Sequence, residues 1–204
     1  MKTNKISVYY GTGTILDREH VKVAAAEDTS EGKSEGKSEG KPEGKSEEQP
    51  GGQKQDQVVL ETSHILIATG SVPACPPIPG SSLPGVVTSD GLLDKKDMFE
   101  HLIIIGGGVI GMEFASVYSS LGHGVTVIEA LDRILPTMDK EIAQNLKMIM
   151  KKRNVDIHTG AKVEEILQTE DGKGLICRYT EKDKPCEARA DGILIATGRR
   201  AYTG

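Results

Sequence analysis

The chain has 204 residues and a formal net charge of −5 at pH 7. Most of the negative charge lies in residues 27–57, so the remainder is close to neutral. This distribution argues against nucleic acid or an anionic membrane surface as a partner. The length suits one domain and part of another.

Apolar runs are all shorter than a membrane span, and the N-terminal residues lead into no signal-peptide core. The three cysteines, Cys75, Cys177 and Cys186, lack the close spacing of a disulfide framework or a zinc site. We therefore expect no metal site, no membrane partner and a reducing, cytoplasmic setting.

Three apolar segments near the N-terminus predict a small antiparallel meander. We expect strands at Ile6–Tyr10, His20–Ala25 and Val58–Leu60, with a glycine turn over Gly11–Ile15. Residues 27–57 contain tandem Ser-Glu-Gly-Lys repeats and almost no apolar side chain. Such a composition cannot bury enough surface to offset the chain entropy, which predicts a disordered, low-complexity loop.

The sequence Ile-Leu-Ile-Ala-Thr-Gly occurs twice, at residues 65–70 and 193–198. We interpret both copies as short buried strands that end in small residues, where a backbone or a ligand comes close. They bracket Ser71–Gly192, a segment of normal domain size that opens with a proline-rich crossover over residues 71–85. The repeat therefore predicts one domain inserted into another, which the chain re-enters along residues 193–204.

The inserted segment is organised around His101–Ala130. An apolar run at Leu102–Ile105 is followed by Gly106-Gly107-Gly108-Val109-Ile110-Gly111, a helical pattern, and a second apolar run that ends at Glu129. Strand, glycine turn, helix, strand and terminal acid are the sequence form of a Rossmann-like βαβ unit that binds a dinucleotide. The predicted fold class is α/β, with a parallel sheet covered on both faces.

The chemistry of a dinucleotide explains each part of this motif. Gly106 permits a tight turn, Gly108 lets a pyrophosphate approach the backbone, and Gly111 lets the helix pack close to the sheet. Glu129 can accept hydrogen bonds from ribose hydroxyls and would repel a 2′-phosphate, which favours NAD over NADP, although Arg133 nearby weakens this preference. The alternatives are a glycine turn that only serves packing, and a site for another adenosine cofactor such as a methyl donor.

Two helices and further strands are expected in the same segment. The first helix spans Val109–Leu121 with Gly122 as its C-cap, and the second begins near Asp139, which can cap it. Their apolar stripes comprise Ile110, Phe114, Val117, Tyr118 and Leu121, and then Ile142, Leu146, Ile149 and Met150. The remaining strands are predicted at Val155–His158, at Lys162–Leu167 and on both sides of a hairpin over residues 180–184.

Six motifs together carry a family resemblance: Gly70–Pro73, Pro77–Gly80, Gly106–Glu113, Val125–Glu129, Asp132–Pro136 and Ala196–Arg200. The combination resembles the flavin-dependent pyridine nucleotide–disulfide oxidoreductases, and in particular the dihydrolipoamide dehydrogenases. This resemblance implies that residues 71–192 are an NAD-binding domain with an antiparallel hairpin. It also implies that residues 1–26, 58–70 and 193–204 are flanking parts of a truncated FAD domain.

The resemblance implies roles for individual residues as well. The turn from Gly106 to Ile110 would hold the NAD pyrophosphate, and Glu129 would hold the adenosine ribose. Val163 would lie near the adenine and Gly198 near the nicotinamide. Residues of a residual FAD site would be Gly13, Thr69, Gly70 and Ser71.

The chain also departs from the family pattern. It lacks the CxxxxC cysteine pair, the first glycine fingerprint for FAD, and the C-terminal dimerisation domain with its His–Glu base. We therefore expect an internal fragment that has no catalytic residue of its own, does not retain FAD and does not turn over.

The parent enzyme would be a homodimer that passes electrons from dihydrolipoamide through a disulfide and FAD to NAD. The alternatives are the NAD-binding portion of a related flavin disulfide reductase or NADH oxidase, and a stand-alone, non-catalytic nucleotide-binding module.

Overall fold

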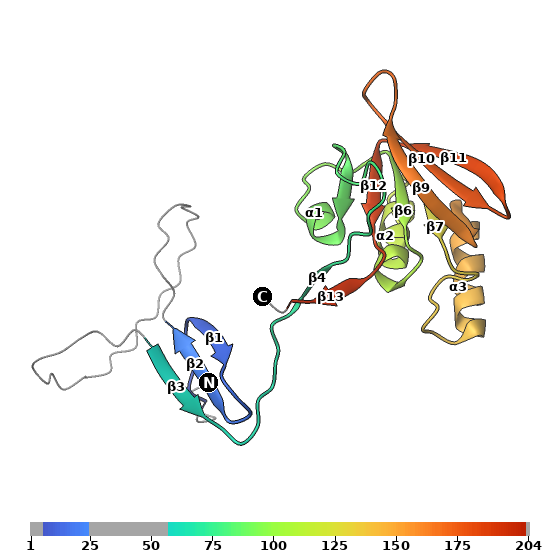
Figure 1. Ribbon diagram of the computed structural model, residues 1–204. Helices are drawn as coiled ribbons and strands as arrows, with labels where there is room; N and C mark the ends of the chain where they lie inside the picture. The colour runs from blue at the N-terminus through green and yellow to red at the C-terminus, as the bar shows by residue number, and fades with distance from the viewer. Residues whose placement is uncertain (1–5, 25–56, 203–204) are drawn as a thin grey trace, which may run out of the picture. The chain divides into compact units, whose positions relative to one another are not determined.

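The computed structural model describes residues 6–24 and 57–202 (Figure 1). The chain divides into two compact units, Met1–Ala68 and Thr69–Gly204. The loop predicted over residues 27–57 lies, except for Gln57, outside the described residues.

The first unit contains the predicted meander, in which β1 (Thr12–Ile15), β2 (His20–Ala24) and β3 (Gln57–Glu61) pair antiparallel in that order. The prediction was wrong about the first strand, because residues 6–10 form none and β1 occupies the expected glycine turn. The cause is the β1–β2 turn. The Asp17 carboxylate accepts hydrogen bonds from the N–H groups of Glu19 at 2.8 Å and His20 at 2.9 Å, which sets the hairpin register.

The two copies of Ile-Leu-Ile-Ala-Thr-Gly differ in structure. Ile193–Ile195 of the second copy lie in β12 (Gly192–Ile195) between two partner strands. Residues 65–70 form no strand, and Leu66 is 90% exposed, so the prediction of a buried strand there was wrong. A strand needs neighbours for its backbone N–H and C=O groups, and none of the described strands pairs with residues 65–70.

The second unit is built on a parallel sheet of five strands in the order β5-β12-β6-β7-β8. Besides β12, its strands are β5 (Val86–Thr88), β6 (His101–Ile105), β7 (Gly124–Glu129) and β8 (Val155–Thr159). The predicted mixed α/β fold with a parallel sheet is confirmed. A two-stranded antiparallel ribbon pairs β4 (Ser71–Pro73), near the start of this unit, with β13 (Arg199–Ala201), near its end.

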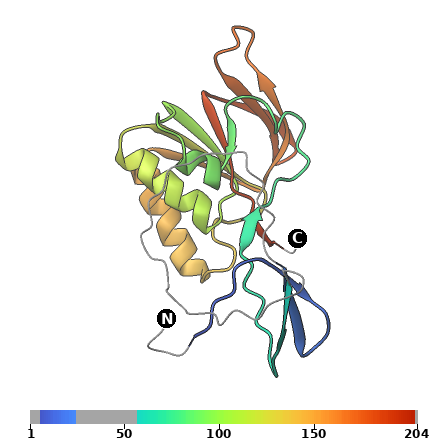
Figure 2. The same cartoon turned by 90° about the vertical axis from the view of Figure 1, so that its left-hand side faces the viewer.

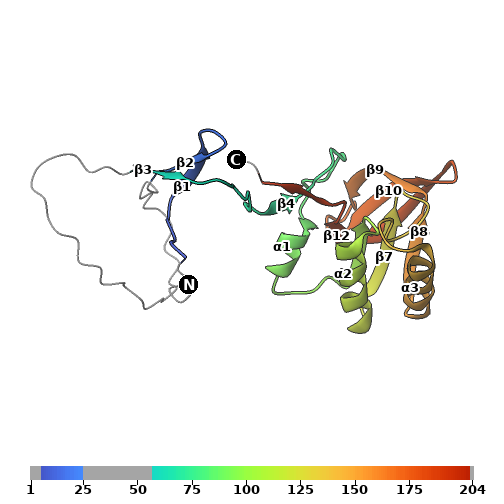
Figure 3. The ribbon, with the colours of Figure 1, turned by 90° about the horizontal axis from the view of Figure 1, so that it is seen from below.

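Both faces of the parallel sheet are covered, as the unbroken apolar runs predicted. Helices α1 (Ser89–Leu93), α2 (Val109–Ser120) and α3 (Lys140–Lys152) lie on one face. The antiparallel sheet of β9 (Ala161–Gln168), β10 (Leu175–Glu181) and β11 (Lys184–Ala190) lies on the other (Figure 3).

Strand β6 shows why its sequence does not alternate with polar residues. Leu102 and Ile104 belong to the core under the helices, whereas Ile103 and Ile105 belong to the core under the antiparallel sheet. Every residue after His101 in this strand is therefore buried on one face or the other.

The buried faces of α2 and α3, which lie side by side in Figure 2, differ from the predicted stripes. Helix α2 buries Gly111, Met112, Ala115 and Tyr118, and α3 buries Ala143 and Met150. Val117, Leu121, Ile142 and Ile149 were predicted to be buried and are exposed. Small residues decide the rotation of α2, because a Cβ at Gly111 would lie 2.1 Å from the Gly106 carbonyl oxygen.

The predicted cap of α3 is confirmed, because the Asp139 carboxylate accepts the Glu141 N–H at 2.8 Å. Helix α2 ends one residue earlier than predicted, at Ser120, and its C-cap is Leu121 rather than Gly122. Gly122 follows the cap with φ 89°, the left-handed conformation that ends many helices. Among residues 6–24 and 57–202, no helix is both long and apolar enough to cross a membrane.

The burial difference on α3 can be tested with two substitutions. Met150→Ala removes a side chain that is 1% exposed and should lower the free energy of unfolding by about 2–5 kcal/mol. Ile142→Ala removes a side chain that is 59% exposed and should change the free energy of unfolding by less than about 0.5 kcal/mol. Urea denaturation followed by circular dichroism measures both, and equal losses would contradict the assigned face of α3.

Candidate functional site

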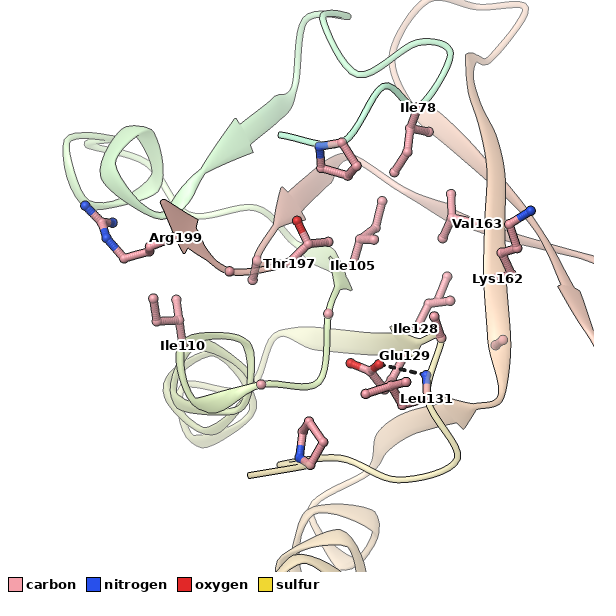
Figure 4. Close-up of a pocket in the computed structure, with 18 of the residues that line it drawn as sticks. Ile78, Ile105, Ile110, Ile128, Glu129, Leu131, Lys162, Val163, Thr197 and Arg199 are labelled. Atoms are coloured by element: carbon pink, nitrogen blue, oxygen red, sulfur yellow. Dashed lines mark hydrogen bonds between the residues drawn. The ribbon is translucent and has the colours of Figure 1, made fainter. Parts of the chain in front are cut away.

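A pocket of about 830 Å³ lies at the carboxyl ends of β6, β7 and β12. From β6 the chain continues to β7 and β8 on one side, while β12 and β5 occupy the other side. Such a reversal of strand order leaves a crevice beyond the strand ends where ligands bind. The walls are completed by residues 76–79, 128–131, 136–137, 161–164 and 196–199 (Figure 4).

The glycine turn between β6 and α2 forms one side of this pocket. Gly106 adopts φ 112°, and a Cβ there would lie 2.5 Å from the Ala196 carbonyl oxygen. Gly111 is required by its contact with the Gly106 carbonyl, described above. A Cβ at Gly108, by contrast, would meet no atom within 4 Å. Packing therefore explains Gly106 and Gly111 and leaves Gly108 facing open pocket space.

Glu129 is a buried carboxylate at the end of β7. Its Oε2 accepts the Gly107 N–H at 2.5 Å, and its Oε1 accepts the Leu131 N–H at 2.8 Å (Figure 4). A carboxylate has about four acceptor positions, so two hydrogen bonds leave capacity for a ligand hydroxyl. Glu129 lines the pocket while holding the glycine turn.

Helix α2 begins at the pocket without a side-chain cap. Its N-cap residue is Gly108, which has no side chain to accept the N–H groups of the first turn. Val109 and Ile110 of that turn line the pocket. Uncapped N–H groups and the positive end of the helix dipole favour an anion at this position.

Two arginines near the pocket are already engaged. Arg199 at the rim donates from Nε to Ser71 Oγ at 2.8 Å, from Nη2 to Ser71 O at 2.7 Å, and from Nη1 to Asp90 Oδ1 at 3.1 Å. Arg133 donates from Nη2 to the Pro136 carbonyl at 3.0 Å and is absent from the pocket lining. The exposed Lys162 pairs with Glu164 at 3.8 Å.

The structure brings together most of the residues predicted for NAD. The pocket is lined by Gly106, Gly108, Val109, Ile110, Glu129, Val163 and Gly198. Gly107 and Gly111 lie behind the lining and pack against Glu129 and Gly106. Of the residues predicted for FAD, Gly13 lies in β1 of the first unit. Thr69, Gly70 and Ser71 are exposed residues at the start of the β4–β13 ribbon and do not line this pocket.

Sequence reasoning missed several lining residues. Ile78 and its neighbouring prolines come from the crossover, and Thr137, Lys162 and Arg199 come from loops and strand ends. Ile105, Ile128 and Ala196 were identifiable from the sequence, because each ends or follows a predicted parallel strand. No sequence signal indicated that the crossover prolines fold back over the strand ends.

A family model described as pyridine nucleotide-disulphide oxidoreductase matches residues 1–204. The chain belongs to this family. Dihydrolipoyl dehydrogenase 3 of Pseudomonas putida is 38% identical over 149 residues, which cover 72% of this chain and 32% of that protein. Dihydrolipoyl dehydrogenase of Bacillus subtilis is 34% identical over 203 residues, which cover 98% of this chain and 38% of that protein.

Solved structures of the family agree with these matches. The copper(II) complex of the HOCl-induced flavoprotein disulfide reductase RclA from Escherichia coli superposes with a TM-score of 0.64 at 32% identity. The match covers 95% of this chain and 36% of RclA. The chain thus spans about a third of the length of the family members it matches.

The two kinds of glycine predict different effects on stability. Gly111→Ala forces a Cβ onto backbone and should lower the free energy of unfolding by about 1–3 kcal/mol or more. Gly108→Ala places a Cβ in open space at φ −73° and should cost less than about 1 kcal/mol, the scale of a poorer N-cap. Thermal denaturation of both variants tests this, and a larger loss at Gly108 would contradict the described turn.

Cysteine reactivity gives a second test of the fold around the site. Burial raises the pKa of the Cys177 thiol to about 12, so the thiol stays protonated at pH 8 and should not react in the folded chain. Cys75 is exposed and should react. Mass spectrometry after iodoacetamide treatment should find Cys75 modified and Cys177 modified only in denaturant. Labelling of Cys177 in the native chain would show that β10 is not packed as described.

Proposed function

We propose that this chain is a Rossmann-like NAD-binding domain with flanking FAD-domain segments, and that it binds NAD(H) in the pocket beyond β6, β7 and β12. The observation that carries the proposal is the convergence of three features on one pocket. These are the open space at Gly108, the uncapped start of α2, and the buried acceptor Glu129.

The proposed binding mode assigns one part of NAD to each region. The pyrophosphate would lie against Gly108 and the first turn of α2, and the adenosine ribose would donate its hydroxyls to Glu129. The adenine would lie toward Val163 and the nicotinamide toward Gly198. Figure 4 supports this order, since Val163 and Arg199 lie at opposite ends of the pocket with Glu129 between them.

The same geometry disfavours the alternatives from the sequence. A turn that served only packing would have no need for an open Gly108. A methyl donor has one nucleoside, whereas this pocket is lined by Val163 of β9 at one end and by Arg199 at the other, a span that suits two nucleosides joined by a pyrophosphate. The negative charge of Glu129 and the engagement of Arg133 by Pro136 both favour NAD over NADP.

For the whole protein we propose a dihydrolipoyl dehydrogenase-like flavoprotein, because relatives with that name match up to the full length of this chain. In this proposal residues 71–192 form the NAD-binding domain, and residues 1–26, 58–70 and 193–204 contribute to the FAD domain. When bound in the whole protein, FAD would supply the chemistry of two-electron transfer between a substrate-reduced disulfide and NAD. The chain has three cysteines and none in a CxxxxC pair, so it should not reduce lipoamide by itself.

Cofactor choice can be tested by titration calorimetry. The chain should bind NADH at least about tenfold more tightly than NADPH, a difference of about 1.4 kcal/mol. Glu129→Ala removes both the ribose acceptor and the repulsive charge, so it should weaken NADH binding and reduce the preference. Gly108→Ala should weaken both cofactors because its methyl group occupies the pyrophosphate position.

Controls separate binding from folding in this titration. Ile142→Ala alters an exposed residue of α3 away from the pocket lining and should bind NADH like the parent sequence. Equal affinities for NADH and NADPH that do not change in Glu129→Ala would refute the NAD-specific proposal. NADH binding that survives Gly108→Ala unchanged would place the nucleotide elsewhere.

A further inference from the structure

The loop between β7 and α3 contains a strained residue next to the glycine turn. Leu135 adopts φ 47°, a left-handed conformation that is uncommon for residues with a side chain. It is also followed by Pro136, whose ring restricts the backbone of the residue before it. Leu135 is only 7% exposed and packs in the core under the helices. Conformations of this kind persist only where the surroundings enforce them, and they often mark functional positions.

The strained conformation lets Leu135 contact the glycine turn through its backbone. The Leu135 N–H donates to the Gly107 carbonyl at 2.8 Å. The N–H of Gly107 is held on its other side by the Glu129 carboxylate at 2.5 Å. The neighbouring Ile134 closes the remaining space, because a Cβ at Gly107 would lie 2.9 Å from its Cγ2 atom. Gly107 is therefore held at both of its backbone polar groups.

Holding the Gly107 carbonyl also orients Gly108. The Gly107 C=O and the Gly108 N–H belong to one planar trans peptide group, so they point in opposite directions. A carbonyl fixed on Leu135 therefore directs the Gly108 N–H away from that loop. Among the described residues, the Gly108 N–H has no hydrogen-bond partner, and Gly108 lines the pocket.

We propose that Leu135 is a positioning residue for nucleotide binding. Its left-handed backbone holds the Gly107 carbonyl and thereby aims the free Gly108 N–H at the pocket, where a pyrophosphate oxygen would accept it. The identity of the ligand rests on the proposed function, whereas the control of Leu135 over the turn does not depend on it.

The control over the turn can be measured in the free chain. In Leu135→Ala the strain remains without the buried side chain that enforces it, so the loop should release Gly107. Leu135→Gly removes the side chain and also the strain, so it should retain the turn better. Leu92→Ala is the matched control, because Leu92 is 6% exposed in the same core but lies in α1, outside both the glycine turn and the Leu135 loop.

The readout is residue-resolved amide hydrogen exchange by NMR, with the residue-135 amide, which donates to the Gly107 carbonyl, compared against Ile104 in β6. We expect the ratio of the residue-135 rate, corrected for the intrinsic rate of each side chain, to the Ile104 rate to rise about tenfold in Leu135→Ala and less in Leu135→Gly, and to stay unchanged in Leu92→Ala. If Leu135→Ala does not fold, the exchange ratio of Leu135→Gly tests the proposal in its place. An unchanged ratio in both Leu135 variants, or the same rise in Leu92→Ala, would overturn the proposal.

A binding arm tests the consequence for the ligand. Leu135→Ala should lose about tenfold in NADH affinity relative to Leu92→Ala, because the Gly108 N–H no longer meets the pyrophosphate. Its affinity for adenosine, which has no phosphate, should match that of Leu92→Ala. Parallel losses for both ligands would overturn the positioning role. A parent chain that binds no NADH would refute the proposed function, and the exchange ratio would still decide whether Leu135 controls the turn.

Discussion

The constraint on which the second unit depends is the close approach of backbones at the β6–α2 turn. A Cβ at Gly106 would collide with the carbonyl that follows β12, and one at Gly111 would collide with the carbonyl of Gly106. Gly107 donates its N–H to the carboxylate that ends β7. Three strand ends and one helix start are brought together by atoms that leave no room for a Cβ. The pocket exists where these elements meet, so the contacts that shape the fold also shape the site.

The glycines of this motif have two different roles, which are packing of the chain against itself and access for a ligand. Gly106, Gly107 and Gly111 are explained by the packing of the chain against itself, whereas Gly108 faces space that the chain leaves open. Glu129 belongs to both groups, since its oxygens hold the turn and its remaining acceptor capacity faces the pocket. Leu135 lies outside the motif and also holds the turn, because its left-handed backbone directs its N–H to the Gly107 carbonyl.

The two arginines near the pocket are both engaged in hydrogen bonds with the chain itself. Arg199 is fixed to the β4–β13 ribbon and to α1, and Arg133 is fixed to its own loop. The phosphates of the proposed cofactor would therefore be held mainly by backbone N–H groups at the start of α2 rather than by arginine. Membership of the pyridine nucleotide-disulphide oxidoreductase family agrees with a nucleotide at such a site. The chain spans about a third of the length of the relatives it matches.

The sequence by itself determined the local features whose causes lie within a few residues. The two-sided burial of Leu102–Ile105, the glycine turn, the Asp139 cap and the acid at the end of β7 all follow from residue type and spacing. These features were sufficient to predict a mixed α/β fold and the part of the pocket lining that the glycine turn, the start of α2 and Glu129 supply.

Only the tertiary structure decided features that depend on distant neighbours. The two identical hexapeptides differ in structure: Ile193–Ile195 lie in an interior strand, whereas residues 65–70 form a largely exposed segment without a strand. The reason is that, among the described residues, only the copy at residues 193–198 has partner strands. The rotation of α2 buries Gly111 and Ala115 and leaves Val117 and Leu121 exposed, because a Cβ in place of Gly111 would collide with the Gly106 carbonyl. The left-handed Leu135 carries no local signal, because its surroundings and not its own preference hold it there.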